Sequence, residues 1–194
     1  MTTTDQQEGV LTLNNVRISF PTLFEAKAVN NGKPQFNVAS LLPKTHPDLP
    51  KVYAAMEAAA KTKWGDKAGE IAKQLKAGDR LAVHDGDAKS QYEGYAGKLF
   101  LNASNKKRPL VIDRDRSILE EKDGKPYAGC FCNVRVQIWA QDNDFGKRIN
   151  ASLLGVQFVG DGERLAGGAV AAPDDFEPIP EAATGEAAAS SMFN

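Results

Sequence analysis

The sequence is poor in the features that mark membrane and secreted proteins. Its 194 residues contain no apolar run that approaches the ~20 residues needed for a membrane-spanning helix. Residues 1–9 are polar and acidic, and they lack the basic and apolar regions of a secretory signal. We therefore expect a cytoplasmic protein that does not bind membranes and has a flexible N-terminus over residues 1–9.

Cysteine and histidine are also scarce. Cys130 and Cys132 stand one residue apart, and the only histidines, His46 and His84, lie far from them in the sequence. A CxC pair supplies two ligands, whereas a structural zinc site needs about four. Positions this close on one strand rarely form a good disulfide. We expect two small buried thiols in a reducing compartment and no metal site.

The common signatures of enzymes are missing as well. The sequence has no GxxxxGK[ST], GxGxxG, GxSxG or HExxH motif. The cluster His84-Asp85-Gly86-Asp87 is the one candidate for a metal site, but two aspartates around a glycine also make an ordinary turn, which we favour. We predict a protein without catalytic residues, metal or cofactor. The alternative is a metal-dependent nuclease that uses Asp85 and Asp87.

Positive charge is absent from the last part of the chain. Residues 172–194 contain five acidic residues and no lysine or arginine, whereas residues 1–171 carry 24 basic and 20 acidic residues, a net charge of +4. Alanine, glycine, proline and acidic residues dominate after Gly160, so we expect a disordered acidic tail over residues 162–194. A tail that only adds solubility is the alternative to one that binds partners. The candidate partner-binding residues of the tail are Asp174, Asp175, Glu177 and Phe193.

The rest of the sequence contains a series of strand patterns that is interrupted once by helices. Apolar periodicity predicts strands over residues 10–20, 35–42, 98–103, 130–140 and 149–159, and helices over about 48–77 with a break near Gly65. The apolar phase of the first strand changes across Asn14-Asn15, which predicts a bend there, and residues 21–33 are predicted to form a loop. Five strands with one helical insertion favour a mainly β OB-type barrel, closed or partly open, over residues 10–161.

Two of the predicted strands carry aromatic, cationic and amide side chains opposite their apolar faces. Proteins that bind single-stranded nucleic acid combine a cationic groove with rings on which bases stack. The alternative is that a helix or a second sheet covers the aromatic rings. Our candidate DNA-binding residues, on these strands and in the segments beside the first of them, are Tyr92, Tyr95, Lys98, Phe100, Asn102, Lys106, Lys107, Arg108, Phe131, Arg135 and Trp139.

Three blocks of the sequence resemble a family of tailed-phage proteins. The blocks are Ile18-Ser19-Phe20-Pro21-Thr22-Leu23-Phe24 with Lys33-Pro34-Gln35-Phe36 and Leu41-Leu42-Pro43-Lys44; Gly94-Tyr95 through Leu101-Asn102-Ala103-Ser104-Asn105-Lys106; and Tyr127-Ala128-Gly129-Cys130. They are similar to the phage single-stranded DNA-binding proteins, formerly a domain of unknown function. The resemblance implies an OB fold and single-strand binding without sequence specificity, in phage replication or recombination in the host cytoplasm.

These observations lead to one predicted function and one rival. We predict that the body binds single-stranded DNA by base stacking and by Lys and Arg contacts to phosphate, and that the tail recruits replication or recombination proteins. The rival is a β-barrel protein-interaction or virion-associated protein that does not bind DNA. The small net charge of the body is the best support for this rival, because many DNA-binding proteins are more basic.

Overall fold

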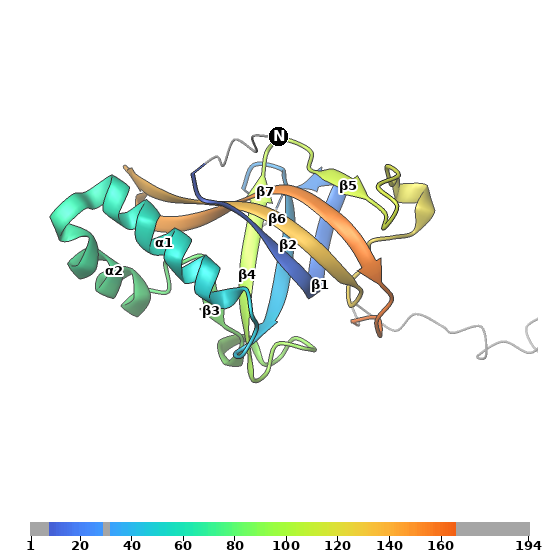
Figure 1. Ribbon diagram of the computed structural model, residues 1–194, viewed down its shortest axis with the longest axis horizontal. Helices are drawn as coiled ribbons and strands as arrows, with labels where there is room; N and C mark the ends of the chain where they lie inside the picture. Colours follow the sequence, from blue (N-terminus) through green and yellow to red (C-terminus); the bar gives the residue numbers. More distant parts are fainter. Residues whose placement is uncertain (1–7, 29–31, 166–194) are drawn as a thin grey trace, which may run out of the picture.

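The computed structural model describes residues 8–28 and 32–165, which form one predominantly β structure with two helices (Figure 1). The strands are β1 (Val10–Lys27), β2 (Gln35–Pro43), β3 (Val83–Asp85), β4 (Lys98–Asn105), β5 (Leu110–Ile112), β6 (Phe131–Asn143) and β7 (Gly146–Gly160). The helices are α1 (Leu49–Trp64) and α2 (Ala68–Ala77), and the short 3-10 turns are η1 (Gly65–Lys67), η2 (Gly86–Lys89) and η3 (Glu121–Asp123). No helix in this part of the chain is long and apolar enough to cross a membrane.

Five of the strands close into a barrel. The hydrogen-bonded order is β3-β4-β2-β1-β6-β7-β5, and a parallel contact between Ser104 of β4 and Ser152 of β7 joins the two sides. Strands β1, β2, β4, β7 and β6 therefore form the closed barrel, to which β3 and β5 add short edge strands. The expected five-stranded OB-type barrel is confirmed.

Strand β1 is longer and more bent than its apolar pattern suggested. The predicted bend at Asn14-Asn15 is confirmed, because Asn15 has a φ of 50° and the pairing of β1 with β6 shifts between Leu13 and Val16. The prediction of a loop from residue 21 is wrong, because β1 continues to Lys27. A second bend at Phe20, where φ is 46°, lets the strand turn a corner of the barrel and go on pairing with β2.

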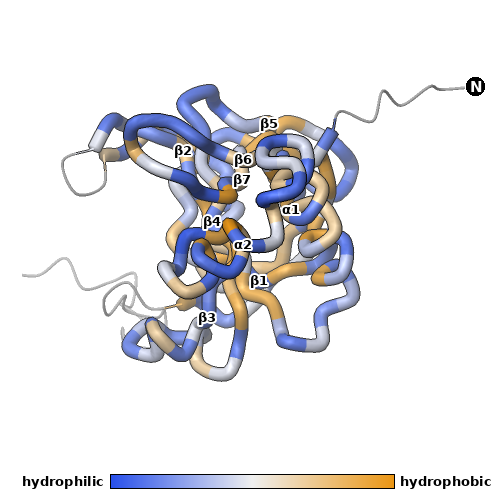
Figure 2. The backbone as a smooth tube through the Cα atoms, turned by 90° about the vertical axis from the view of Figure 1, so that its left-hand side faces the viewer, coloured by the Kyte–Doolittle hydropathy of each residue, from blue (hydrophilic) through white to orange (hydrophobic). Residues whose placement is uncertain are grey.

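The inward faces of the strands meet in one apolar core. The predicted inner face of β6 is confirmed, since Cys132, Val134 and Val136 are completely buried. Cys130 and Cys132 are both buried free thiols whose sulfur atoms lie 3.6 Å apart. Figure 2 shows apolar segments gathered in the strands and mostly hydrophilic connections at the surface. The core therefore holds the barrel together without a disulfide in the described part of the chain.

The helical insertion joins the barrel at the bend of β1. Helix α1 packs on β6, and Gly65 separates it from α2, as the sequence predicts. Asp48, at the N-cap position of α1, is almost completely buried. Its carboxylate accepts hydrogen bonds from the backbone N–H of Asn14 at 2.8 Å, from the Asn14 side-chain amide at 3.1 Å and from Lys51 at 2.8 Å. The bend of β1 and the start of α1 are thus tied to one carboxylate.

Replacing Asp48 with alanine is expected to lower the free energy of unfolding by about 2–3 kcal/mol, because the Asn14 donors lose their buried acceptor. Burial raises the pKa of Asp48, but the hydrogen bonds from Lys51 and Asn14 outweigh it, so the pKa lies below its ordinary value of 3.8. The contribution of Asp48 is therefore present at neutral pH and declines as the pH falls below about 4. Urea unfolding at pH 7 and pH 3 measures both effects. If Asp48→Ala lowers the free energy of unfolding by the same amount at pH 7 and pH 3, the role of the ionised carboxylate is contradicted.

Candidate nucleic-acid interface

The outer face of β2 and β4 forms the floor of the candidate site. These antiparallel strands pair Ala39 with Asn102 and Asn37 with Ser104. Because side chains alternate across a strand, these four point away from the core, while Val38 and its cross-strand partner Ala103 point into it. Asn102 and Ser104 are exposed. The outer face of an OB barrel at its second and third strands is the usual place for oligonucleotides, and β2 and β4 occupy those positions here.

Part of this face is covered by a second, smaller apolar cluster. Tyr95 and Phe100, with exposed fractions of 2% and 3%, pack with Ala39, Leu41 and Leu165. The rings of Tyr95 and Phe100 meet edge to face at a centroid distance of 5.1 Å. Our prediction that these two rings are exposed is therefore wrong: the segment that follows β3 folds back over β4 and buries them.

Two further rings remain exposed above this cluster. Tyr92 lies 41% exposed and packs edge to face against Phe20 at a centroid distance of 5.1 Å. Phe20 is 51% exposed, and its ring centroid lies 6.3 Å from that of Tyr95. The buried rings thus support the exposed pair from below. Burial also raises the pKa of Tyr95, whose hydroxyl bonds to Ser19, so the supporting ring is neutral.

A network around Asp87 holds the covering segment in place. The Asp87 carboxylate accepts hydrogen bonds from the backbone N–H of Gly97 at 2.6 Å and from Lys44 at 3.4 Å. These bonds lower the pKa of Asp87, with the Gly97 bond as the main cause. Asp85 in turn accepts the backbone N–H of Asp87 at 3.0 Å. The two aspartates therefore build a turn, and the described residues contain no cluster of three or more side chains that could hold a metal ion.

Two hollows lie side by side on this surface. The first, of about 770 Å³, contains Phe20 and Tyr92, and the second, of about 550 Å³, contains Trp139. Both are lined by Gln35, Asn102 and Ser104, so they form one continuous depression, which we call the β2–β4 groove. The groove runs from the Phe20–Tyr92 pair over β2 and β4 to Trp139 on β6.

The ring at the far end of the groove is held in a fixed position. Trp139 Nε1–H donates a hydrogen bond to Ser152 Oγ at 2.9 Å. Trp139 pairs with Asn150 of β7, and 41% of its surface stays exposed. A ring fixed at its polar edge and open on its surface is suited to stacking on a flat ligand.

The charges around the groove are of one sign. Among the described residues, no aspartate or glutamate lines either hollow, and no groove cation forms an ion pair with a carboxylate. The ammonium group of Lys89 also lies 5.4 Å from the centroid of the Phe100 ring. A depression lined by cations without anions attracts polyanions. The cations that line it are Lys27, Lys33, Lys89, Lys106 and Arg148.

The structure brings together only some of the candidate residues. Arg135 instead donates a hydrogen bond to Thr12, the Arg108 guanidinium lies 5.7 Å above the ring of Phe24, and Phe131 lies beside Gly162. The candidates that line the groove are Tyr92, Tyr95, Phe100, Asn102, Lys106 and Trp139. The candidates that line neither hollow are Lys98, Lys107, Arg108, Phe131 and Arg135.

Several groove residues escaped the sequence analysis. Phe20 was assigned only to an apolar strand, and its exposure depends on its left-handed backbone, which the sequence does not reveal. The groove cations that were missed are Lys27, Lys33, Lys89 and Arg148. The candidate tail residues Asp174, Asp175, Glu177 and Phe193 lie outside the described residues. The last described residue, Leu165, packs with Tyr95 and Phe100.

Sequence comparison places the chain among phage proteins. Residues 10–188 match the family described as Enterobacter phage Enc34, ssDNA-binding protein. Putative protein p50 of Acyrthosiphon pisum secondary endosymbiont phage 1 is 43% identical over 184 residues, which cover 92% of this chain and 98% of that protein.

Structural comparison points to the same proteins. The single-stranded DNA-binding protein from bacteriophage Enc34, solved in complex with ssDNA, matches with a TM-score of 0.69 and 27% identity over 82% of this chain and 91% of that chain. The single-stranded DNA-binding protein gp2.5 of bacteriophage T7 matches with a TM-score of 0.53 and 13% identity over 93% of this chain and 98% of that one, which shows a shared fold. Because the family match spans most of its length, the chain belongs to the Enc34 ssDNA-binding protein family.

Proposed function

We propose that the chain binds single-stranded DNA along the β2–β4 groove, without sequence preference. The observation that carries the proposal is the composition of the groove, in which three exposed rings and five cations stand without a carboxylate among the described residues. The Enc34 relative, whose structure is described as a complex with ssDNA, supports it. The setting is phage DNA replication or recombination in the cytoplasm of the bacterial host.

Base stacking supplies one part of the binding free energy. The Phe20–Tyr92 pair stacks bases at one end of the groove, and Trp139 stacks a base at the other. Each stacked base contributes about 1–3 kcal/mol, whatever its identity, because every base has a flat π face. The chain therefore prefers unpaired strands, whose bases are free to turn toward the protein.

Phosphate contacts supply the other part. Lys27, Lys33 and Lys89 stand at the Phe20 end of the groove, and Lys106 and Arg148 stand at the Trp139 end. Their ammonium and guanidinium groups hold the backbone of a strand whose bases lie over the polar floor. Contacts of this kind fix the strand in place but carry no sequence information.

An oligo-dT titration followed by fluorescence anisotropy tests the proposal. We expect micromolar or tighter binding at low salt, weaker binding at higher salt, and little preference between oligo-dT and mixed sequences. A duplex of equal length serves as the control and is expected to bind more weakly. No binding at low salt would refute the proposal, and a stable protein partner in pull-downs would then favour the protein-interaction alternative.

Phe20 offers a test that separates stability from binding. Glycine and alanine at this position remove the same ring, so both variants are expected to bind oligo-dT more weakly to an equal degree. The left-handed backbone favours glycine, so the free energy of unfolding of Phe20→Gly is expected to exceed that of Phe20→Ala by about 1 kcal/mol. Urea unfolding and anisotropy measure the two effects. Equal stability of the variants would show that the φ of 46° is not retained.

The tail lowers the affinity for DNA in this proposal. Residues 173–194 carry five acidic side chains. Leu165, the last described residue before the tail, packs with Tyr95 and Phe100 at the Phe20–Tyr92 end of the groove. Removing residues 173–194 is expected to tighten oligo-dT binding about threefold to tenfold at low salt, with a smaller effect at high salt. The full-length variant with Asp174→Asn, Asp175→Asn and Glu177→Gln is the matched control for charge. Unchanged affinity after truncation would contradict this role of the tail.

The tail also recruits other proteins in this proposal. Asp174, Asp175, Glu177 and Phe193 offer carboxylates and one ring to a basic pocket on a replication or recombination protein. Pull-downs from phage-infected cells with the full-length and the truncated chain compare the partners that each retains. Identical partners for both chains would contradict recruitment through the tail.

A further inference from the structure

The chain does not leave the folded body at the end of β7. Residues 161–165, which we call the C-terminal strap, are fixed to the segment that precedes β6 and to β1. The backbone N–H of Leu165 donates a hydrogen bond to the Ala128 carbonyl at 3.0 Å. The guanidinium of Arg17 on β1 donates a hydrogen bond to the Glu163 carbonyl at 2.7 Å. The strap is therefore fastened at its middle and at its last residue.

One aromatic ring and two glycines fasten the rest of the strap. The Tyr127 hydroxyl donates a hydrogen bond to Asp161 at 2.7 Å, and the Arg164 guanidinium lies 4.1 Å from the centroid of the Tyr127 ring. A Cβ atom at Gly129 would overlap the backbone of the strap, and one at Gly162 would overlap the Gly129 carbonyl. Glycine at both positions therefore allows the two backbones to lie this close, and the strap is held along its whole length.

The strap ends at the aromatic end of the β2–β4 groove. Leu165 is 9% exposed and belongs to the apolar cluster of Tyr95 and Phe100. A Cβ atom added to Gly94 would lie 3.3 Å from a methyl carbon of Leu165 and 3.2 Å from one of Leu41. The Leu165 side chain therefore packs against the backbone that leads into Tyr95.

The Tyr95 ring connects this contact to the exposed pair. Its centroid lies 5.7 Å from that of Tyr92 and 6.3 Å from that of Phe20. Both exposed rings thus pack on Tyr95, and Tyr95 packs with Leu165. A ring that is held in place before DNA arrives loses less conformational freedom on binding, so support of this kind raises the affinity.

The cluster around Leu165 is separate from the main core of the barrel. The residues that fill the barrel and those that pack around Leu165 form two distinct groups of buried side chains. Leu119, which follows β5, is 5% exposed and belongs to the main core, so it is a leucine of similar burial outside the cluster of Tyr95. Loss of the Leu165 side chain is therefore expected to act on the aromatic end of the groove, whereas loss of the Leu119 side chain is not.

We propose that the C-terminal strap positions the Phe20–Tyr92 pair for single-stranded DNA, with Leu165 as the positioning residue. This role rests on the proposed function of the β2–β4 groove. It gives the C-terminal part of the chain two opposed effects on DNA binding. The strap strengthens binding by holding the exposed rings in place, and the acidic residues 173–194 weaken it by competing with phosphate.

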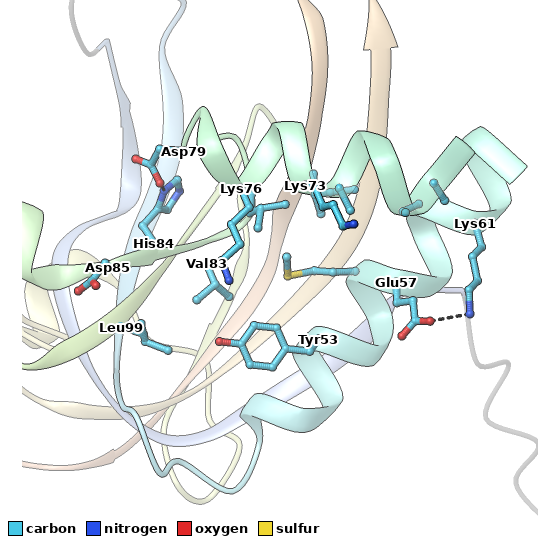
Figure 3. Close-up of a pocket in the computed structure, with 17 residues that line it drawn as sticks. Tyr53, Glu57, Lys61, Lys73, Lys76, Asp79, Val83, His84, Asp85 and Leu99 are labelled. Atoms are coloured by element: carbon cyan, nitrogen blue, oxygen red, sulfur yellow. Dashed lines mark hydrogen bonds and ion pairs between the residues drawn. The ribbon is translucent and has the colours of Figure 1, made fainter. Parts of the chain in front are cut away.

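Fluorine NMR of the full chain labelled with 3-fluorotyrosine tests the proposal without DNA. The chain has four tyrosines, and replacement of each by phenylalanine assigns its signal. Leu165→Ala is expected to move the Tyr92 signal, and the matched variant Leu119→Ala is expected to leave it unchanged. Tyr53 lies on α1 beside the hollow between the helices and β3 (Figure 3), so its signal is expected to stay in place and to show that the variant is folded.

A Tyr92 signal that is the same in the unchanged and the Leu165→Ala chains would overturn the proposal. If Leu165→Ala does not fold, Leu165→Val, which removes less of the side chain, takes its place with the same expected shift of the Tyr92 signal.

Binding and crosslinking give a second readout. Leu165→Ala is expected to weaken oligo-dT binding about threefold to 30-fold, because the exposed rings stay in the chain but lose their support. With an oligo-dT that carries 5-iodouracil, the yield of crosslinks at Phe20 and Tyr92 is expected to fall relative to that at Trp139. Leu165→Met is expected to restore this ratio, and Leu119→Ala is expected to keep it.

A crosslink ratio that is unchanged in Leu165→Ala would overturn the proposal. Absence of oligo-dT binding by the unchanged chain would instead refute the proposed function of the groove, and the Tyr92 fluorine signal would still decide whether the strap positions the pair.

Discussion

A chain in which Tyr92 and Trp139 are both replaced by alanine is expected to bind oligo-dT about 30-fold to 20,000-fold more weakly than the unchanged chain. Each ring stands at one end of the β2–β4 groove, each is 41% exposed, and each stacked base is worth about 1–3 kcal/mol. The two losses add, because the rings lie in different hollows and do not contact each other. Anisotropy titrations of both single variants and the double variant measure the effect and its additivity.

Tyr53→Ala is the control for the loss of an exposed ring. Tyr53 is 48% exposed on α1 and lines neither hollow of the groove, so its replacement is expected to leave the affinity for oligo-dT unchanged. Each replaced ring is more than half buried, so the double variant is expected to be less stable, and urea unfolding checks that it stays folded under the titration conditions. A double variant that folds normally and binds as tightly as the unchanged chain would exclude stacking at these two positions.

The affinity for oligo-dT is expected to fall about 100-fold between 50 and 200 mM monovalent salt. Five cations line the groove, and each phosphate contact to a single strand adds about −0.7 to the slope of log K against log salt, which gives about −3.5. Replacing Lys106 and Arg148 with glutamine is expected to make this slope about 1.4 less steep and to weaken binding at low salt. Titrations at four salt concentrations give both slopes.

The neighbouring cations Lys107 and Arg108 provide the matched control. They follow Lys106 directly, yet neither lines the groove, and Arg108 lies against the ring of Phe24. Their replacement by glutamine removes the same amount of charge but is expected to leave the slope nearly unchanged. Equal changes of slope for the two pairs would show that the body attracts DNA by its overall charge and not by the groove.

The sequence was sufficient to predict the inward-facing residues of the strands. Alternation along residues 130–140 identified the buried side of β6, because burial of one face fixes which side of a strand must be apolar. The helical break at Gly65 and the bend at Asn14-Asn15 were also predictable, because each depends on local chemistry: a glycine without a side chain, or a change in apolar phase.

The exposure of the outward-facing residues was less predictable. Phe100 points outward from β4, as predicted, but Tyr95 comes back over it through a turn that depends on the hydrogen bond between Asp87 and Gly97. That contact joins residues ten positions apart and leaves no periodic signal in the sequence. The opposite error was made at Phe20, whose apolar pattern hides a left-handed backbone that brings the ring to the surface.

Groove residues that lie far apart in the sequence were the hardest to group. Arg148 of β7 and Lys106, just after β4, reach the same hollow only because β4 and β7 meet at Ser104 and Ser152. Sequence reasoning favoured the run Lys106-Lys107-Arg108, of which only the first residue lines the groove. Closure of the barrel therefore determines which cations belong to the site, and closure is a property of the whole chain.

Photo-crosslinking with an oligo-dT that carries 5-iodouracil tests the central claim most directly, because it reports which side chains the bases touch. The claim is that an unpaired strand crosses the outer face of β2 and β4 between the Phe20–Tyr92 pair and Trp139. The expected result is crosslinks at Phe20, Tyr92 and Trp139, located by mass spectrometry of the digested complex. Crosslinks confined to the helices or to the surface around β5, with none at these three rings, would contradict the claim.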